Sequence, residues 1–389
     1  MAQPTYQTQP TDSPMWASEP FRVFFPLGIL AAVLGAMLWP LFYWGVWTYA
    51  PHLQHPRIMM FGFGFAFVNG FLGTAWPRFL EAEALRRFEV LLLVSTWLAA
   101  QGCYLTNHLQ AGDSIFAAHA LALLVVLSCR LRPGKELPPP GFALAFFAVV
   151  IALAVSVFWA THPVDLSPTA WTMSKLFVWQ GMLLFPLLGI GSYLFPRFFQ
   201  MPGTRPLMPS ARLRFIGVWL TGATITLSLV LEGLGYIRLG NAIRLVAMLF
   251  WAALATPAIW KAKATTTRAW GLRMAVGSIA ASFLIRTLWP GPGYAIEHLL
   301  LIGGFGLALL LVADRVTMGH CAEPGTSSPA RSIFWRWIVW LILLAATTRA
   351  SADMKASLLI SHHVYAALLW AGIVIAWLIQ LAPMWWRRD

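Results

Sequence analysis

The stretch GFALAFFAVVIALAVSVFWA, residues 141–160, decides the fold class. Its twenty residues carry no charge and only one hydroxyl group, that of Ser156. A helix of twenty residues rises about 30 Å, which matches the thickness of the hydrocarbon core of a bilayer. The stretch is therefore predicted to be a transmembrane helix.

The composition of the whole chain points the same way. Apolar residues make up 59% of the 389 residues and charged residues only 11%, and the mean hydropathy is +0.69. Soluble domains carry about 25% charged residues. The net charge of +13 does not predict a nucleic-acid partner, because the basic residues lie between apolar runs rather than in a mixed basic and aromatic patch. The lipid bilayer is the expected partner of most of this surface.

Eleven further apolar runs flank residues 141–160, and most approach the roughly 20 residues that a transmembrane helix needs. They lie at 21–47, 56–77, 88–107, 114–129, 172–195, 214–233, 241–259, 270–288, 294–313, 333–348 and 356–381. A lipid-exposed chain must satisfy its own backbone, and these runs are too long for barrel strands. The sequence thus predicts an all-α polytopic membrane protein of about twelve helices in one bundle. Residues 21–389 form its single domain, after a flexible polar tail at 1–20 that lacks the basic start of a signal peptide.

The positions of the basic residues give the orientation. With twelve spans, one side of the membrane receives both termini and twenty of the 27 Lys and Arg residues, and the other side receives seven. Basic residues concentrate in cytoplasmic loops. Both termini are therefore expected in the cytoplasm.

Histidines carry most of the functional information. Of nine, a group on four different spans falls within about two turns of the outward side: His55, His119, His298, His362 and His363. Imidazole is a usual axial ligand of haem iron and a good ligand of copper. Ionisable residues inside a membrane are functional candidates by default. The competing interpretation is that each histidine only bonds a nearby carbonyl, water or lipid headgroup, and the sequence alone does not decide between the two.

Three segments then resemble a known family. The run HPRIMMFGFGFAFVNGFLGTAWP at 55–77 is similar to the signature of the NnrS family, as is HLLLIG at 298–303 followed by DRVTMGH at 314–320. A third segment, GSYLFPRF at 191–198, is a weaker match. The chain departs from the family pattern where Arg57 replaces a His, Ile58 a Glu and Tyr193 an Arg.

The resemblance implies a bacterial inner-membrane protein that contains haem and copper and belongs to nitric oxide stress and denitrification. It places His55, His298 and His320 on motif positions, whereas His119, His362 and His363 are added by the predicted topology. Arg315 could bind a haem propionate or a lipid phosphate. Nitric oxide or another small diatomic is the implied ligand, with an unidentified electron donor, and the resemblance leaves open whether the protein turns nitric oxide over, binds it or senses it.

A period of four spans accompanies these motifs. Pro-Arg-Phe closes both the second span, at 77–79, and the sixth, at 196–198, and the tenth ends at Arg315. This period is similar to the three four-helix arcs of haem–copper oxidase catalytic subunits. An oxidase activity of that type is disfavoured, because the sixth and seventh spans contain no histidine.

Two other function classes stay open. One is a metal-free small-solute transporter with Glu297, Arg315 and Lys175 along its path. The other is an assembly factor that passes haem or copper to other proteins, with His320 and Cys321 as exchangeable ligands.

Overall fold

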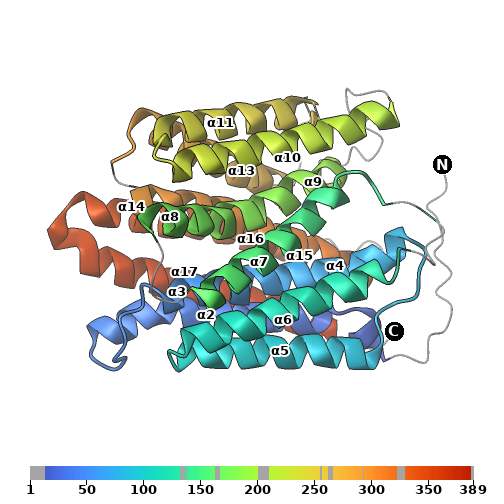
Figure 1. Cartoon of the computed structure of the whole chain (residues 1–389), viewed down its shortest axis with the longest axis horizontal. Helices are drawn as coiled ribbons and strands as arrows, with labels where there is room; N and C mark the ends of the chain where they lie inside the picture. Colours follow the sequence, from blue (N-terminus) through green and yellow to red (C-terminus); the bar gives the residue numbers. More distant parts are fainter. Residues whose placement is uncertain are drawn as a thin grey trace.

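The fold is described from a computed structural model. It covers residues 14–131, 136, 138–162, 167–199, 210–254, 256–261, 266–291, 293–321 and 329–386. Over these ranges the chain consists of helices and connecting turns and contains no β-strand. Twelve helices are long and apolar enough to cross a membrane, which confirms the predicted all-α polytopic class (Figure 1).

Nine spans are single helices, and three are built from an α-helix, a π-helical stretch and a second α-helix. In chain order they are α2 (Phe21–Tyr43); α3 (Gln54–Arg57), η1 (Ile58–Gly64) and α4 (Phe65–Phe79); α5 (Arg87–Leu105); α6 (Leu109–Ser128); α7 (Phe142–Thr161); α8 (Pro168–Leu176), η2 (Phe177–Gly181) and α9 (Met182–Phe198); α10 (Ala211–Gly233); α11 (Ile237–Leu254); α13 (Thr267–Leu288); α14 (Gly293–His298), η3 (Leu299–Gly306) and α15 (Leu307–Cys321); α16 (Pro329–Ser351); and α17 (Leu359–Trp385). Short helices α1 (Met15–Ser18), α12 (Ala258–Lys261), η4 (Ala352–Met354) and η5 (Ala356–Leu358) complete the described chain.

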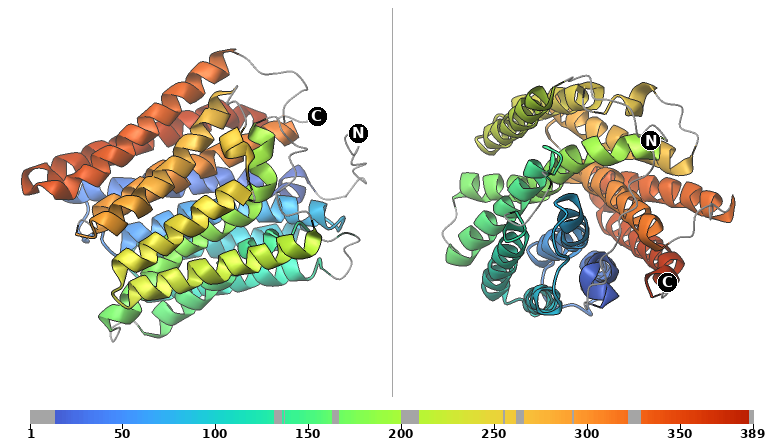
Figure 2. Two further views of the ribbon diagram at one scale, coloured as in Figure 1. Left: turned by 90° about the horizontal axis from the view of Figure 1, so that it is seen from above. Right: turned by 90° about the vertical axis from the view of Figure 1, so that its right-hand side faces the viewer.

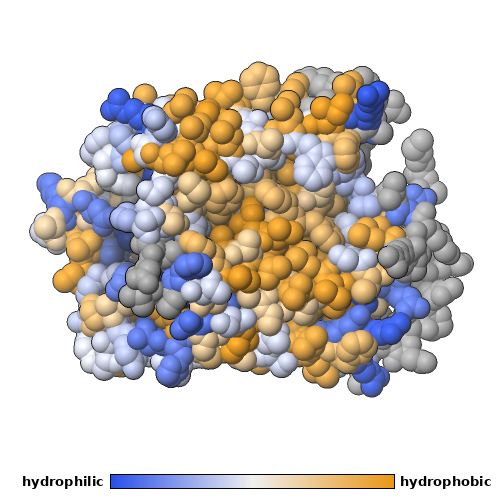
Figure 3. Space-filling view, viewed as in Figure 1, coloured by the Kyte–Doolittle hydropathy of each residue, from blue (hydrophilic) through white to orange (hydrophobic). Residues whose placement is uncertain are grey.

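The membrane-facing surface is a broad apolar band with polar residues at both ends of the bundle, as Figure 3 shows on one face. The helices run along the direction that joins the two polar ends (Figure 1). The first span begins on the side where the last span ends, because the Arg22 guanidinium donates a 2.5 Å hydrogen bond to the carbonyl of Trp385. We call this the basic side, since it holds the start of the first span, the end of the last span and most of the arginines of the described chain.

Part of the predicted polar tail is packed against the bundle. Residues 15–18 form α1, with Ala17 buried, and Glu19 forms ion pairs with Arg22 at 2.7 Å and Arg78 at 2.6 Å. Residues 1–13 lie outside the described ranges. Residues 14–20 therefore contact the helical bundle.

The fourth span begins earlier than the sequence indicated. It runs from Leu109 instead of residue 114, because Asp113 lies inside the helix and is buried. Asp113 is tolerated there because Arg57 of the second span neutralises it at 2.8 Å. A hydropathy profile treats a carboxylate as the end of a span. When the carboxylate is paired with a cation inside the membrane, the helix continues past it.

The spans pack in three successive runs of four. In the first, α16 packs on α17, α17 on α2 and α2 on α4; in the second, α5 packs on α6, α6 on α7 and α7 on α9; in the third, α10 packs on α11, α11 on α13 and α13 on η3. The end-on view in Figure 2 shows the colours following one another around the bundle in this order. Each run ends on a span with a π-helical stretch, namely the second, sixth or tenth. This is the three-arc pattern that the four-span period predicted.

The three terminal spans of the runs meet near the middle of the bundle. Phe67 of α4, Leu187 of α9 and Ala308 of α15 line one small apolar cavity of about 70 Å³. These spans are also the most buried of the twelve. Side chains on their inner faces are therefore shielded from lipid.

Helices α7 and α9 approach each other at two glycines. A Cβ atom on Gly189 would lie 2.1 Å from the carbonyl oxygen of Gly141, and one on Gly141 would lie 2.2 Å from the carbonyl oxygen of Gly189. Neither distance is possible for real atoms, so both positions need glycine. Such small-residue contacts are a common way for membrane helices to pack backbone to backbone.

Candidate functional site

Three of the predicted histidines line a single cavity. His55 comes from α3, His298 from the end of α14 and His363 from α17, so the second, tenth and twelfth spans each contribute one. The cavity measures about 80 Å³. Its other walls are mainly apolar and include Trp39, Met59, Met60, Phe63, Leu183, Leu301, Ile302, Arg349 and Trp370.

Hydrogen bonding fixes the tautomer of His55. Its Nδ1 lies 2.8 Å from the carbonyl oxygen of Gly35, which can only accept, so Nδ1 carries the proton. The lone pair of the neutral ring is then on Nε2, the nitrogen that a metal would use. Gly35 also makes room for Met59, one turn after His55, whose Sδ lies 2.9 Å from the position of a Cβ on Gly35. An imidazole and a thioether therefore sit side by side at the cavity.

His363 is held in a similar way. Its Nδ1 lies 2.9 Å from the hydroxyl of Tyr43, and its Nε2 is buried without a hydrogen-bond partner. The nearest carboxylate oxygen, that of Asp353, lies 3.9 Å from Nε2. The ring of Trp39 packs edge-on against both imidazoles, with centroids 5.1 Å from His363 and 6.3 Å from His55. A buried ring nitrogen without a protein partner is free to accept a hydrogen bond or to bind a metal ion.

One cation lines the same cavity. Arg349 of α16 lies 3.6 Å from Asp353 and keeps about 14% of its side chain exposed. A guanidinium beside an apolar pocket is suited to bind an anionic group such as a carboxylate. The sequence did not single out Arg349, because an isolated Arg near the end of a span resembles an interfacial anchor.

A buried charge network lies next to His298. Glu232 of α10 forms ion pairs with Arg244 of α11 and Arg286 of α13, and Arg286 lies 3.0 Å from Glu297. Gln180 of η2 links Glu297 to Arg244, because it donates to Glu297 at 3.1 Å and accepts from Arg244 at 2.8 Å. Two carboxylates and two guanidiniums balance each other. The network thus fixes five spans around the residue that precedes His298, without net charge.

The substitution of Arg57 for the family's second histidine has a clear structural setting. Arg57 binds both carboxylate oxygens of Asp113 at 2.8 to 3.1 Å, and its guanidinium lies 4.6 Å above the ring of Trp159. Tyr104 adds a 3.0 Å hydrogen bond to the same carboxylate. Arg57 is absent from the lining of the histidine cavity. It therefore ties the second span to the fourth.

His119 is placed apart from the cavity. Because the fourth span begins at Leu109, His119 lies ten residues into the helix, deeper than the sequence suggested. Its Nε2 accepts from the amide of Asn69 at 2.9 Å and its Nδ1 lies 2.9 Å from the hydroxyl of Thr96. Both ring nitrogens thus have protein partners, and no lone pair is left for a metal.

The remaining predicted site residues are spread over the bundle. His362, next to His363, turns to Ser351, whose hydroxyl lies 3.0 Å from its Nδ1. His320 lies at the basic end of α15 with Nδ1 2.8 Å from the carbonyl of Val316. Arg315 is exposed near the same end. None of the three lines the histidine cavity.

The side chains around the cavity limit which metal cofactor it could hold. Among the described residues, no group of three or more His, Cys, Asp or Glu side chains is arranged to hold one metal ion. Haem needs only one or two protein ligands, because the porphyrin supplies four nitrogens. His55, His363 and the apolar walls fit that requirement. A porphyrin is larger than the 80 Å³ cavity, so lining side chains must move to admit it, and flexible Met59 and Met60 are suited to do so.

The comparison with known families now decides the relationship. A family described as NnrS protein matches residues 15–388, nearly the whole chain. The chain belongs to the NnrS family. This membership supports a role in the nitric oxide response for a multi-pass membrane protein. None of the curated proteins matches the chain. The resemblance seen at 55–77, 191–198 and 298–320 is thereby confirmed.

Proposed function

We propose that this NnrS-family chain is a bacterial inner-membrane protein that binds haem at the cavity of His55, His298 and His363 and acts on, or responds to, nitric oxide. One observation carries the proposal: two imidazoles on different spans line one mainly apolar cavity with their Nδ1 atoms engaged by the protein, and a third imidazole lines the same cavity. Haem would supply an iron centre that binds a diatomic gas. The three histidines are the residues that would hold it.

The chain's own groups have definable roles in such a site. The carbonyl of Gly35 and the hydroxyl of Tyr43 orient the two imidazoles and set which nitrogen is free. Arg349 is placed to pair with an anionic edge group, in the role that the sequence assigned to Arg315. The indoles of Trp39 and Trp370 and the ring of Phe63 exclude water from the cavity.

Copper is the second candidate cofactor. The cavity of about 80 Å³ is large enough for one ion and a diatomic ligand. Met59 offers the soft thioether that Cu(I) selects, and the imidazole of the adjacent His55 also suits copper. His320 is not part of this candidate site.

Access for a small apolar gas is supported by a second cavity. The 70 Å³ cavity between the second, sixth and tenth spans has an almost wholly apolar lining, and Leu183 borders both cavities. Apolar cavities of this kind stay dry and take up apolar guests. Nitric oxide dissolved in the bilayer would reach the histidines through the protein interior.

Three further points belong to the proposal. The positive-inside rule places the basic side, with both termini, in the cytoplasm. Any turnover of nitric oxide requires an external electron donor. The transporter alternative is less well supported, because Glu297 is neutralised within the buried network and the exposed Arg315 lies near the opposite end of the tenth span.

The test is the cofactor content of purified protein. The full chain is expressed with ample haem and copper, purified in detergent, and examined by visible spectroscopy before and after dithionite and nitric oxide, with metal analysis. The wild type is expected to show a haem band that shifts with nitric oxide. His298→Ala is expected to lower haem content, and so are His55→Ala and His363→Ala. His52→Ala, at an exposed position, is the matched control and should retain full haem.

Equal haem content in the His298 and His52 variants would refute the ligand assignment. Wild-type protein with neither haem nor copper would refute the cofactor proposal as a whole. A colourless preparation stabilised by a specific solute would favour the transporter, and substoichiometric haem lost on washing would favour an assembly factor.

A further inference from the structure

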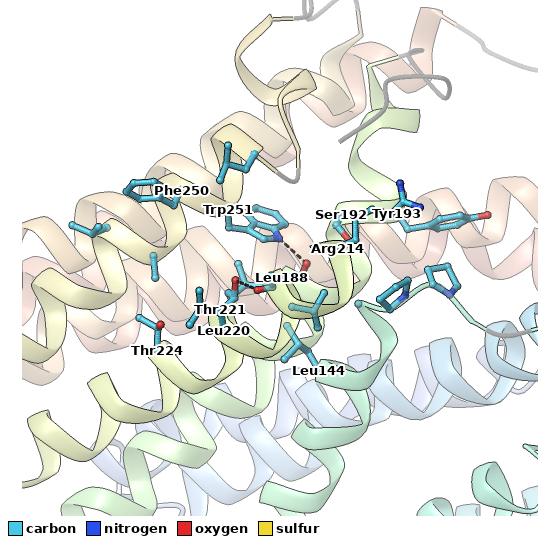
Figure 4. A pocket seen from close by; sticks show the side chains of 18 of the residues that line it. Leu144, Leu188, Ser192, Tyr193, Arg214, Leu220, Thr221, Thr224, Phe250 and Trp251 are labelled. Atoms are coloured by element: carbon cyan, nitrogen blue, oxygen red, sulfur yellow. Dashed lines mark hydrogen bonds between the residues drawn. The ribbon is translucent and has the colours of Figure 1, made fainter. Parts of the chain in front are cut away.

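A third cavity shares no lining residue with the histidine cavity. It measures about 810 Å³ and is formed by α7, α9, α10 and α11, where the second run of four spans meets the third (Figure 4). Volumes of roughly 300–1,000 Å³ are typical of sites for organic ligands. The cavity is open toward the membrane, because α10 and α11 belong to the least buried spans of the bundle.

Most of the cavity wall is aliphatic or aromatic. Leu144, Leu188, Leu220, Val246 and Phe250 give it the character of a slot for a hydrocarbon chain. If a slot of this size were unfilled, the side chains that line it would lose van der Waals contacts. A long apolar ligand that fills it is therefore favoured over a void.

The neutral polar groups of the wall are mostly satisfied by the protein. The hydroxyl of Ser192 donates to the carbonyl of Gly189 at 2.7 Å, and that of Thr221 donates to Gly217 at 2.7 Å. The indole of Trp251 donates to a carbonyl of α9 at 2.8 Å. These groups thus offer little to a ligand whose head needs neutral hydrogen-bond donors, such as a quinol.

Two arginines at the basic end of the cavity, unlike its neutral polar groups, can bind a charged ligand. Arg197 of α9 donates to the carbonyl of Tyr193 at 2.7 Å and lies 3.7 Å above its ring, and Arg214 of α10 lines the cavity beside it. Figure 4 shows Arg214 next to Ser192 and Tyr193 at one end of the cavity. In the described part of the chain neither guanidinium pairs with a carboxylate. Arg130, on the same side, is paired with Glu89 at 2.6 Å.

We propose that this cavity is a binding site for an anionic phospholipid, with an acyl chain along the apolar wall and the phosphate between Arg197 and Arg214. The charges are complementary, since phosphate accepts from guanidinium in a bidentate manner. The location also fits, because basic pockets between transmembrane helices on the cytoplasmic side bind anionic headgroups. The lipid would join the two runs of spans at the point where the protein packs least closely. The site is independent of the haem proposal.

The test compares two lipids on the full chain. Native mass spectrometry of detergent-purified protein is used to titrate phosphatidylglycerol and phosphatidylcholine with identical acyl chains. Phosphatidylglycerol is expected to bind at one lipid per chain and more tightly than phosphatidylcholine. Arg214→Gln should weaken the binding of phosphatidylglycerol about fivefold, and Arg197→Gln/Arg214→Gln should weaken it about 25-fold. Each factor corresponds to the attraction of roughly one basic residue to an anionic lipid. Arg336→Gln, exposed on the same side but outside the cavity, should bind as the wild type does.

Two more variants distinguish the contribution of the headgroup to lipid binding from that of the apolar slot. Arg197→Lys/Arg214→Lys keeps the charge and should retain most of the preference for phosphatidylglycerol. Ala247→Phe, which fills the slot, should weaken both lipids. Equal binding of the two lipids by the wild type would overturn the proposal. So would wild-type binding of phosphatidylglycerol by an Arg197→Gln/Arg214→Gln variant that remains monodisperse. Stoichiometric ubiquinol binding that displaces phosphatidylglycerol and ignores both arginines would overturn it in favour of a quinol site.

Discussion

Replacing Asp113 by leucine gives the sharpest test of the packing described above. Arg57 and Asp113 expose only 7% and 1% of their side chains and share three hydrogen bonds of 2.8 to 3.1 Å. Removal of one partner from a buried ion pair leaves the other charge buried and unpaired, which destabilises the fold by about 3–5 kcal/mol. Asp113→Leu should therefore lower the free energy of unfolding by about that amount. Tyr104 loses its acceptor at the same time, which adds roughly 1 kcal/mol.

The double variant Arg57→Leu/Asp113→Leu should recover most of the loss, because an apolar pair of similar shape is often neutral relative to a buried ion pair. Unfolding is followed by tryptophan fluorescence as sodium dodecyl sulfate is titrated into dodecyl maltoside micelles. The control removes the exposed pair of Arg86 and Glu83, 3.3 Å apart, and should have no measurable effect. If Asp113→Leu is as stable as that control, or if the double variant is less stable than the single one, the pairing argument fails.

Three further outcomes are expected. Gly189→Leu should separate α7 from α9 and lower the melting temperature strongly, whereas Gly277→Leu, with open space around it, should leave the melting temperature unchanged. Tyr43→Phe removes the hydrogen bond that orients an imidazole of the candidate site, so metal or haem affinity should fall roughly 10- to 100-fold, with the exposed Tyr365→Phe as control. Leu183→Trp should slow rebinding of a diatomic gas after flash photolysis without loss of cofactor; an unchanged rate would argue against the apolar route.

The spans and the general position of the site could be predicted because both rest on local pattern. Hydropathy alone locates a twenty-residue run, and the motifs containing His55 and His298 place two candidate ligands at those ends of their spans that lie opposite the basic side. His363 follows once the twelve-span topology fixes its depth. Helix neighbours, by contrast, are not encoded in hydropathy. The contact between the second, tenth and twelfth spans therefore emerged only from the folded bundle.

His119 shows the physical limit of depth arguments. A span boundary drawn at a charged residue is wrong when that charge is paired inside the membrane, as Asp113 is by Arg57. The difference of five residues changes the depth expected for His119 by more than one helical turn. Similarly, Arg244 and Gln180 are isolated in sequence, and only the packing of their spans reveals the network that neutralises Glu232.

The π-helical stretches make the spacing within the central spans as important as the residue types. A π turn accommodates about one residue more than an α turn. Each stretch therefore rotates the rest of its span by roughly 100° relative to an uninterrupted α-helix. This rotation lets one end of the second span present His55 to the histidine cavity and the other end present Phe67 to the apolar cavity.

Deletion of a single residue from 58–64 would leave a good α-helix of almost the same length, but it would turn one half of its side chains away from their cavity. Substitutions in this segment can be absorbed by repacking, whereas a change of length cannot. In relatives of this chain, the number of residues between the first histidine and the closing proline of the second span should thus vary less than the residues themselves.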